Sequence, residues 1–424
     1  MRLCLCVSAL VLPAFLILSS SAMARDLSGQ SKTYLQSREG VDSSKFLPFY
    51  EYFDFKAEDF ASLASQNVSF HFGGWARTDL ADESYGKKTN NDLQYAYLTI
   101  RKSTANTALD LGRLFIREGV VSELVDGAYA RTDLVRGVRV AAFGGVPVET
   151  NFDGRSGDAV YGGRISEAYP GLYRLGFSYL KERNNRTDFR EEEGGDLWFR
   201  PVNWAEVLGT SSYNALTRAW MQHNYNLLLG PFYNFSLRTE ATRISYKDYF
   251  TGTTTSAFTF LPTGLIDLNE KLSTEGGELS YSFGKTGLSA EYKKYSYDIA
   301  GDANYYGAKL RYSDPKNWGT GVSFHRMSGE TDTLKYYDYR AYAYKKLGKA
   351  DITADLFAVS YDVEINGVKN AYSASLASGY YVIEKGRLSA DIEYAHNPYY
   401  DKEVRGFVKF VYNFGSPYGA KRGK

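Results

Sequence analysis

The sequence predicts a transmembrane, up-and-down antiparallel β-barrel of about 20 strands, within a range of roughly 16–22. Three observations support this fold class. After residue 66 the chain is a series of short segments with alternating apolar and polar residues. Their connections alternate between tight turns and longer polar loops, as in membrane barrels. The 37 tyrosines and 25 phenylalanines supply enough aromatic residues for interfacial girdles.

The first 24 residues read as a secretory signal peptide. Met1-Arg2-Leu3 precedes an apolar run to Leu18, and Ala22-Met23-Ala24 matches a cleavage site. Both cysteines, Cys4 and Cys6, fall within this segment, so we expect a mature chain without disulfides.

Residues 25–66 differ from the remainder of the chain. They begin polar and continue through an aromatic-rich stretch at 46–55. We expect a periplasmic N-terminal arm that packs at the barrel mouth.

The barrel itself is expected over residues 67–414, followed by a tail at 415–424. Period-two alternation marks the strand candidates. These are 67–78, 91–101, 106–116, 127–134, 136–146, 158–168, 172–182, 194–202, 204–211, 218–229, 233–247, 272–284, 287–298, 302–313, 318–328, 334–346, 349–362, 369–383, 387–396 and 403–414.

The connections between these candidates indicate the topology. Tight turns built on Gly, Pro, Asn or Asp, such as 284–287 and 314–317, alternate with longer segments. The longer set is 79–90, 117–126, 147–157, 183–193, 248–271 and 329–333. Short turns on one side and long loops on the other predict both termini at the periplasmic end and an even strand number.

The last strand is the clearest, and it is expected to close the barrel against 67–78. One face carries Val404, Gly406, Val408, Phe410, Tyr412 and Phe414, and the other carries Arg405 and Lys409. We expect Phe410, Tyr412 and Phe414 to form a lipid-facing girdle, because a base facing lipid at mid-bilayer costs about 2–4 kcal/mol.

The same sorting of faces predicts a charged, water-filled lumen. The lumen-facing candidates are Arg139, Arg164, Arg174, Arg200, Arg238, Glu278, Glu291, Lys293, Lys309, Arg311, Asp351, Asp355, Asp391, Glu393, Arg405 and Lys409. Two interpretations remain open. The charges face one another across the pore as a filter, or they pair within the wall and keep the lumen wet. Their near-balance predicts weak ion selectivity.

Two loops are candidates for narrowing the pore. Ile116–Gly127 either folds inward or forms an ordinary surface hairpin, and the second is slightly favoured. The apolar part of 248–271 favours inward folding or contact with a partner.

No catalytic, cofactor or metal motif stands out. His71, His223, His325 and His396 are not spaced as a metal pair, and there is no phosphate-binding loop or nucleophile elbow. The net charge of +1 argues against a nucleic-acid surface. We therefore expect a protein that is not an enzyme.

From residue 67 to 414 the chain resembles the porin-like barrels of Gram-negative outer membranes. Its terminal aromatics, Phe410, Tyr412 and Phe414, resemble the signal read by the barrel-assembly machinery, although Lys409 and the following tail depart from that pattern. The resemblance implies an outer-membrane channel for passive diffusion of ions or small polar solutes. The alternative is a barrel that sheathes a multihaem cytochrome in a porin–cytochrome conduit.

Overall fold

The protein is described by a computed structural model covering residues 26–39, 44–63, 66–83, 86–102, 105–148, 158–250 and 267–415. The predicted signal peptide lies outside the described residues, as does the predicted tail beyond Gly415. The same holds for the apolar part of the 248–271 loop.

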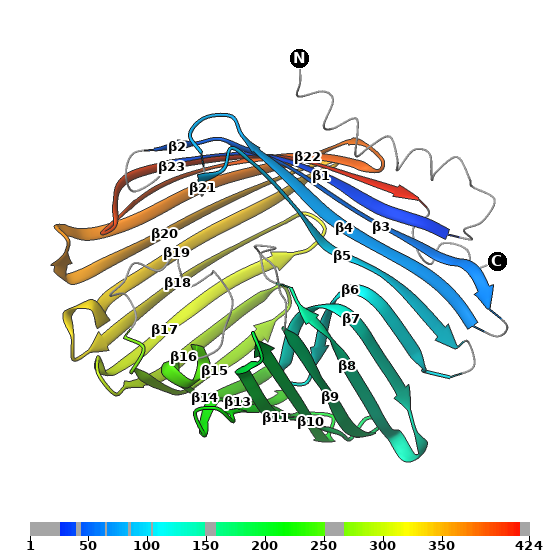
Figure 1. Cartoon of the computed structure of the whole chain (residues 1–424). Helices are drawn as coiled ribbons and strands as arrows, with labels where there is room; N and C mark the ends of the chain where they lie inside the picture. Colours follow the sequence, from blue (N-terminus) through cyan, green and yellow to red (C-terminus); the bar gives the residue numbers. More distant parts are fainter. Residues whose placement is uncertain are drawn as a thin grey trace.

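The chain folds into β-strands that follow one another around a barrel (Figure 1). The first half comprises β1 (Asp26–Glu39), β2 (Lys45–Phe46), β3 (Pro48–Leu63), β4 (Gln66–Asp79), β5 (Thr89–Lys102), β6 (Ala108–Glu118), β7 (Val121–Asp133), β8 (Val138–Pro147), β9 (Ala159–Tyr169), β10 (Tyr173–Asn184), β11 (Thr187–Val202) and β12 (Ala205–Asn214). The second half comprises β13 (Ala219–Phe232), β14 (Phe235–Ser245), β15 (Lys271–Phe283), β16 (Thr286–Tyr297), β17 (Gly301–Asp314), β18 (Trp318–Gly329), β19 (Lys335–Leu347), β20 (Ala350–Ile365), β21 (Val368–Ile383), β22 (Gly386–Asn397) and β23 (Tyr400–Gly415).

Helical structure among the described residues is confined to short pieces. These are η2 (Val135–Gly137), α2 (Tyr246–Phe250) and η4 (Asp332–Leu334). No helix in the described part of the chain is long and apolar enough to cross a membrane.

The barrel closes between its first and last strands. β1 pairs antiparallel with β23, from Ser28 opposite Gly415 to Ser37 opposite Gly406. β2 pairs only with the end of β1, so the closed wall has 22 strands. An even number of antiparallel strands brings the start of β1 and the end of β23 to the same rim, as Figure 1 shows.

The closure corrects two predictions. Residues 26–63 are not a periplasmic arm, because β1 and β3 are full strands of the wall. The terminal strand closes on β1 rather than on 67–78, which is β4 and pairs with β3 and β5. The apolar–polar alternation of β1 is weak in the sequence, because its outward row includes Gly29, Ser31 and Thr33, which are not apolar.

Each of the twenty predicted strand segments corresponds to one strand from β4 to β23. Long connections are confirmed at 80–88, 148–158 and 246–270. The prediction of long loops at 117–126 and 183–193 is wrong, because most of both ranges is strand. There, adjacent strands continue to two-residue turns at Gly119-Val120 and Asn185-Arg186. Gly119, Asn185 and Arg186 have positive φ angles of 64°, 48° and 67°, as tight hairpin turns require.

The two faces of the wall differ in chemistry. One cross-strand row, around Leu279, Leu310, Leu356, Leu376 and Ile392, is apolar and 47–55% exposed. This row is continuous through directly opposed residues, for example Leu288 with Leu310 and Leu310 with Val322. We assign it to the outside of the barrel, because an inward hairpin described below covers part of the opposite face.

Candidate channel lumen

Strand register determines which predicted residues share a face. Strand pairings around the closed barrel place the predicted lumen-facing residues on the face opposite the apolar row. The exception is Arg200, which has no directly opposed residue because it lies in the irregular stretch between Phe199 and Val202. The same pairings place Phe410, Tyr412 and Phe414 on the outer face. There, Phe414 stacks on Phe53 with ring centroids 5.6 Å apart.

A connected group of charges lies on the inner face of β14–β17. Glu291 binds two ammonium groups, with Lys309 Nζ at 2.6 Å and Lys293 Nζ at 3.1 Å. Lys293 also reaches Glu240 at 2.8 Å, and Lys309 reaches Glu278 at 3.0 Å. The result is a chain of alternating charges along the wall, termed the ion-pair ladder below.

The ladder extends to β18 and β19 through a histidine. His325 Nδ1 lies 3.1 Å from Asp338 Oδ1, and its Nε2 lies 3.7 Å from Glu291 Oε2. The His325 side chain is 4% exposed and stacks on Tyr305 at 4.9 Å. No role was predicted for this histidine, although its alternating position within β18 is a signal that assigns it to the inner face.

Other predicted charges also pair within the wall. Arg387 contacts Asp351 at 2.7 Å, Arg164 contacts Asp196 at 2.6 Å, and Arg405 contacts the neighbouring Glu403 at 2.7 Å. Arg340 likewise binds Asp355 through two nitrogens. These contacts match the second interpretation of the sequence, in which the charges pair locally and keep the lumen wet.

The β6–β7 hairpin leaves the wall partway along its length. β5 pairs with β6 only as far as Ala96 opposite Arg113, and β7 pairs with β8 only as far as Val125 opposite Pro147. Residues 115–118 of β6 and 121–124 of β7 pair with each other alone. Figure 1 shows these strand ends curving into the barrel.

A row of glycines lies where the hairpin bends. Gly112, Gly127 and Gly145 stand directly opposite one another across β6, β7 and β8. Gly112 has a φ of +131°, and a Cβ there would lie 2.2 Å from the carbonyl oxygen of Ala96. The bend therefore requires glycine at this position.

An apolar core forms beneath the inward hairpin, which is defined as residues 113–126. Leu114, Ile116, Val121 and Val125 are at most 4% exposed. They belong to one buried cluster with residues of the wall, namely Tyr129, Ala141, Phe143, Val160 and Leu180. Burying this much apolar surface favours the inward position.

Polar contacts fix the tip of the hairpin to three further strands. The Val120 amide donates to Ser178 Oγ of β10 at 3.2 Å. Arg190 of β11 donates to Glu123 at 2.6 Å. Arg164 of β9 lies 3.6 Å from Glu118, whose other oxygen accepts a hydrogen bond from the Tyr129 hydroxyl.

The opposite face of the inward hairpin is turned toward open lumen. Phe115 is 49% exposed, and the Arg117 guanidinium lies 4.9 Å from its ring centroid. The inward alternative for Ile116–Gly127 is therefore confirmed over most of that segment, and the favoured surface-hairpin interpretation is wrong. Apolar residues on both faces of a short alternating segment are the sequence signal for this arrangement.

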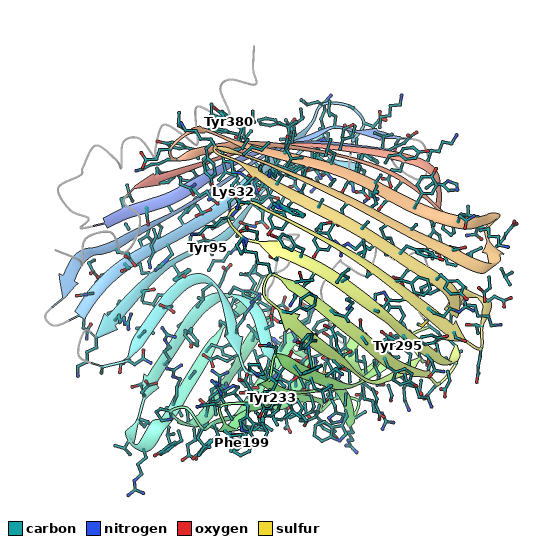
Figure 2. All side chains as sticks on the ribbon, turned by 180° about the vertical axis from the view of Figure 1, so that it is seen from behind. Lys32, Tyr95, Phe199, Tyr233, Tyr295 and Tyr380 are labelled. Carbon is teal, nitrogen blue, oxygen red and sulfur yellow. The ribbon has the colours of Figure 1, made fainter. Side chains whose placement is uncertain are left out.

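Aromatic rings cover the inner face at the closure, across β23, β1, β3 and β4. Phe407, Tyr34, Tyr52, Trp75 and Tyr50 form a contiguous patch with centroid separations of 5.2–6.4 Å. His71 and Tyr97 extend it on β4 and β5, stacked at 4.6 Å. Figure 2 labels Lys32 and Tyr95 on this side of the barrel and Tyr295 on the other.

Within the described ranges, no group of three or more His, Cys, Asp or Glu side chains is arranged to hold a metal ion. Several charged residues of the lumen pair with one another instead, as Lys293 and Lys309 do with Glu291.

No protein-family model and no curated protein sequence matches this chain. Solved structures do resemble it. The translocation pore of the P pilus usher PapC matches with a TM-score of 0.51 and 9% identity, covering 91% of this chain and 99% of that one. OccK8 (OprE) of Pseudomonas aeruginosa matches at 0.46 and 8%, covering 92% and 98%, and OccAB2 of Acinetobacter baumannii at 0.45 and 10%, with the same coverage. The match to the usher pore shows that the chain has the fold of an outer-membrane β-barrel channel.

Proposed function

We propose that this protein is an outer-membrane channel through which ions or small polar solutes diffuse passively. The observation that carries the proposal is the closed 22-strand wall whose inner face bears the ion-pair ladder. Charged groups require water or partners, and a barrel of this width is too wide for its own side chains to fill.

In our proposal the inward hairpin narrows the lumen and so restricts the size of the solutes that can pass. It occupies lumen beside β9–β11 and presents Phe115 and Arg117 to the remaining space. Solutes would pass between the inward hairpin and the opposite wall, so the hairpin would set the size limit. The paired charges support weak rather than strong ion selectivity.

A sheath for a multihaem cytochrome is the second candidate, and the inward hairpin weighs against it. A folded protein within the barrel would have to share the lumen with residues 113–126 or displace them. In either case we propose two partners. One is the membrane lipid, and the other is the barrel-assembly machinery, which would recognise Phe410, Tyr412 and Phe414.

Conductance of the purified mature chain in a planar lipid bilayer tests the proposal. We expect stepwise open-channel currents with a reversal potential near zero in a salt gradient. A folded barrel that carries no current and co-purifies with a haem protein would contradict it and support the sheath.

A further inference from the structure

A pocket of about 650 Å³ opens on the inner wall across β16–β20. Four of its lining residues are tyrosines, namely Tyr295, Tyr305, Tyr336 and Tyr361, and all four are half-buried. The volume falls within the range of roughly 300–1,000 Å³ found for small-molecule sites. Its lining residues come from strands on the other side of the barrel from the inward hairpin.

The charged groups of the pocket balance one another. Lys293 and Lys309 line it together with Glu291 and Asp338. Both ammonium groups contact Glu291, and Asp338 contacts His325. An ion entering this pocket would compete with partners that are already in place, so the site offers little net charge to a charged solute.

A neutral polyhydroxylated solute meets no such competition. Each carboxylate has about four acceptor positions and each ammonium three donors, so the present contacts leave positions for hydroxyl groups. The tyrosine rings offer flat apolar faces beside these polar groups. Tyr336 and Tyr361 form an edge-to-face pair with centroids 6.1 Å apart, and Tyr295 stacks on Tyr297.

We propose that this pocket binds neutral sugars, with a pyranose ring packed against the tyrosines and its hydroxyl groups shared among Lys293, Lys309 and Glu291. The inference rests on the proposed function only in requiring that solutes reach the lumen. It adds a substrate class to the channel.

Equilibrium binding to the purified full mature chain in lipid nanodiscs tests the site without relying on conduction. Maltose and maltotriose serve as neutral probes, and glycine and glutamate as zwitterionic and charged probes. Saturation-transfer NMR and calorimetry should show saturable binding of the sugars and much weaker binding of the amino acids.

Two variants locate the site. Tyr336→Ala should weaken sugar binding roughly ten-fold by removing a ring from the pocket. Tyr52→Ala, a half-buried inward tyrosine in the aromatic patch of β3, is the matched control and should bind as the unaltered chain does. Heat-modifiable migration on gels verifies that both variants are folded.

Three results would overturn the proposal: no saturable sugar binding by the folded barrel, tighter binding of the amino acids, or equal losses in the two variants. A barrel that binds sugars but carries no current would refute the diffusion channel and leave the pocket standing. A barrel that conducts but binds no sugar would refute the sugar pocket and leave the diffusion channel standing.

Discussion

Arg190 on β11 donates a hydrogen bond of 2.6 Å to Glu123 on the inward hairpin, across 67 residues of sequence. Arg190 is held in turn by Glu192 through two nitrogens, at 2.5 and 2.8 Å. The arginine is thus fixed to the wall, and Glu123 is one of the contacts that hold the hairpin tip to it. The Arg190 and Glu123 side chains are 14% and 9% exposed, so neither charge is readily hydrated if the other is removed.

The first prediction concerns this contact. Arg190→Gln should loosen the inward hairpin by about 1–3 kcal/mol, because Glu123 then keeps its burial without a cation. Single-channel recordings should show larger or more variable conductance levels. Arg340→Gln is the control, since Arg340 pairs with Asp355 between β19 and β20. Identical recordings from the two variants would show that the ion pair does not hold the hairpin.

The second prediction concerns the bend. Gly112→Ala should destabilise the folded barrel by about 1–3 kcal/mol, because the new Cβ meets the Ala96 carbonyl at 2.2 Å in a strained backbone conformation. The temperature of heat-modifiable migration on gels measures the change. Gly195→Ala is the matched control, since its nearest neighbour would lie 3.8 Å away. An unchanged transition in Gly112→Ala would mean that the bend does not depend on glycine.

The third prediction concerns selectivity. Lys309→Gln removes a cation that pairs with both Glu278 and Glu291, which should shift the reversal potential in a KCl gradient toward cation preference. The interaction of unit charges about 4 Å apart in water is about 1 kcal/mol, so a permeability ratio changed by a few-fold is expected. Lys294→Gln removes the same charge from the outer face, where Lys294 pairs with Asp302, and should leave selectivity unaltered. A shift toward anions in Lys309→Gln would contradict the placement of the ladder.

The fourth prediction concerns closure. Thr33 and Phe410 face each other across β1 and β23, so the double variant Thr33→Cys/Phe410→Cys should form a disulfide on oxidation. A shift in gel mobility reversed by reductant reports the bond. Phe72→Cys/Phe410→Cys tests the rejected closure on β4 and should not cross-link. The opposite pattern would restore residues 26–63 to a position outside the wall.

Twenty strands could be predicted from the sequence because their outward rows are apolar and their inward rows are charged. β1 and β3 could not, for a physical reason. The outward row of β1 contains Ser31 and Thr33, whose hydroxyl groups both donate to the outward Glu51 of β3 at 2.6 Å. A polar cluster on the outer face removes the contrast between faces on which the prediction relied.

The inward hairpin was only half predicted. Its glycines and mixed residues suggested inward folding as one of two alternatives, but the surface alternative was favoured. Both faces of this hairpin lie inside the barrel, one against the wall and one toward the lumen, so neither face has the composition of a lipid surface. Local pattern fixes the strands, whereas the contact of Val120 with Ser178 and of Glu123 with Arg190 depends on the closed barrel.

The most direct test of the restricted channel compares two conductances in planar bilayers. The first chain is unaltered. The second chain has residues 114–125 replaced by an Asn-Gly turn that joins Arg113 to Asp126, which are directly opposed in β6 and β7. We predict stepwise currents from both and a clearly larger unitary conductance from the shortened chain. Equal or smaller conductance from a folded, shortened barrel would contradict the account.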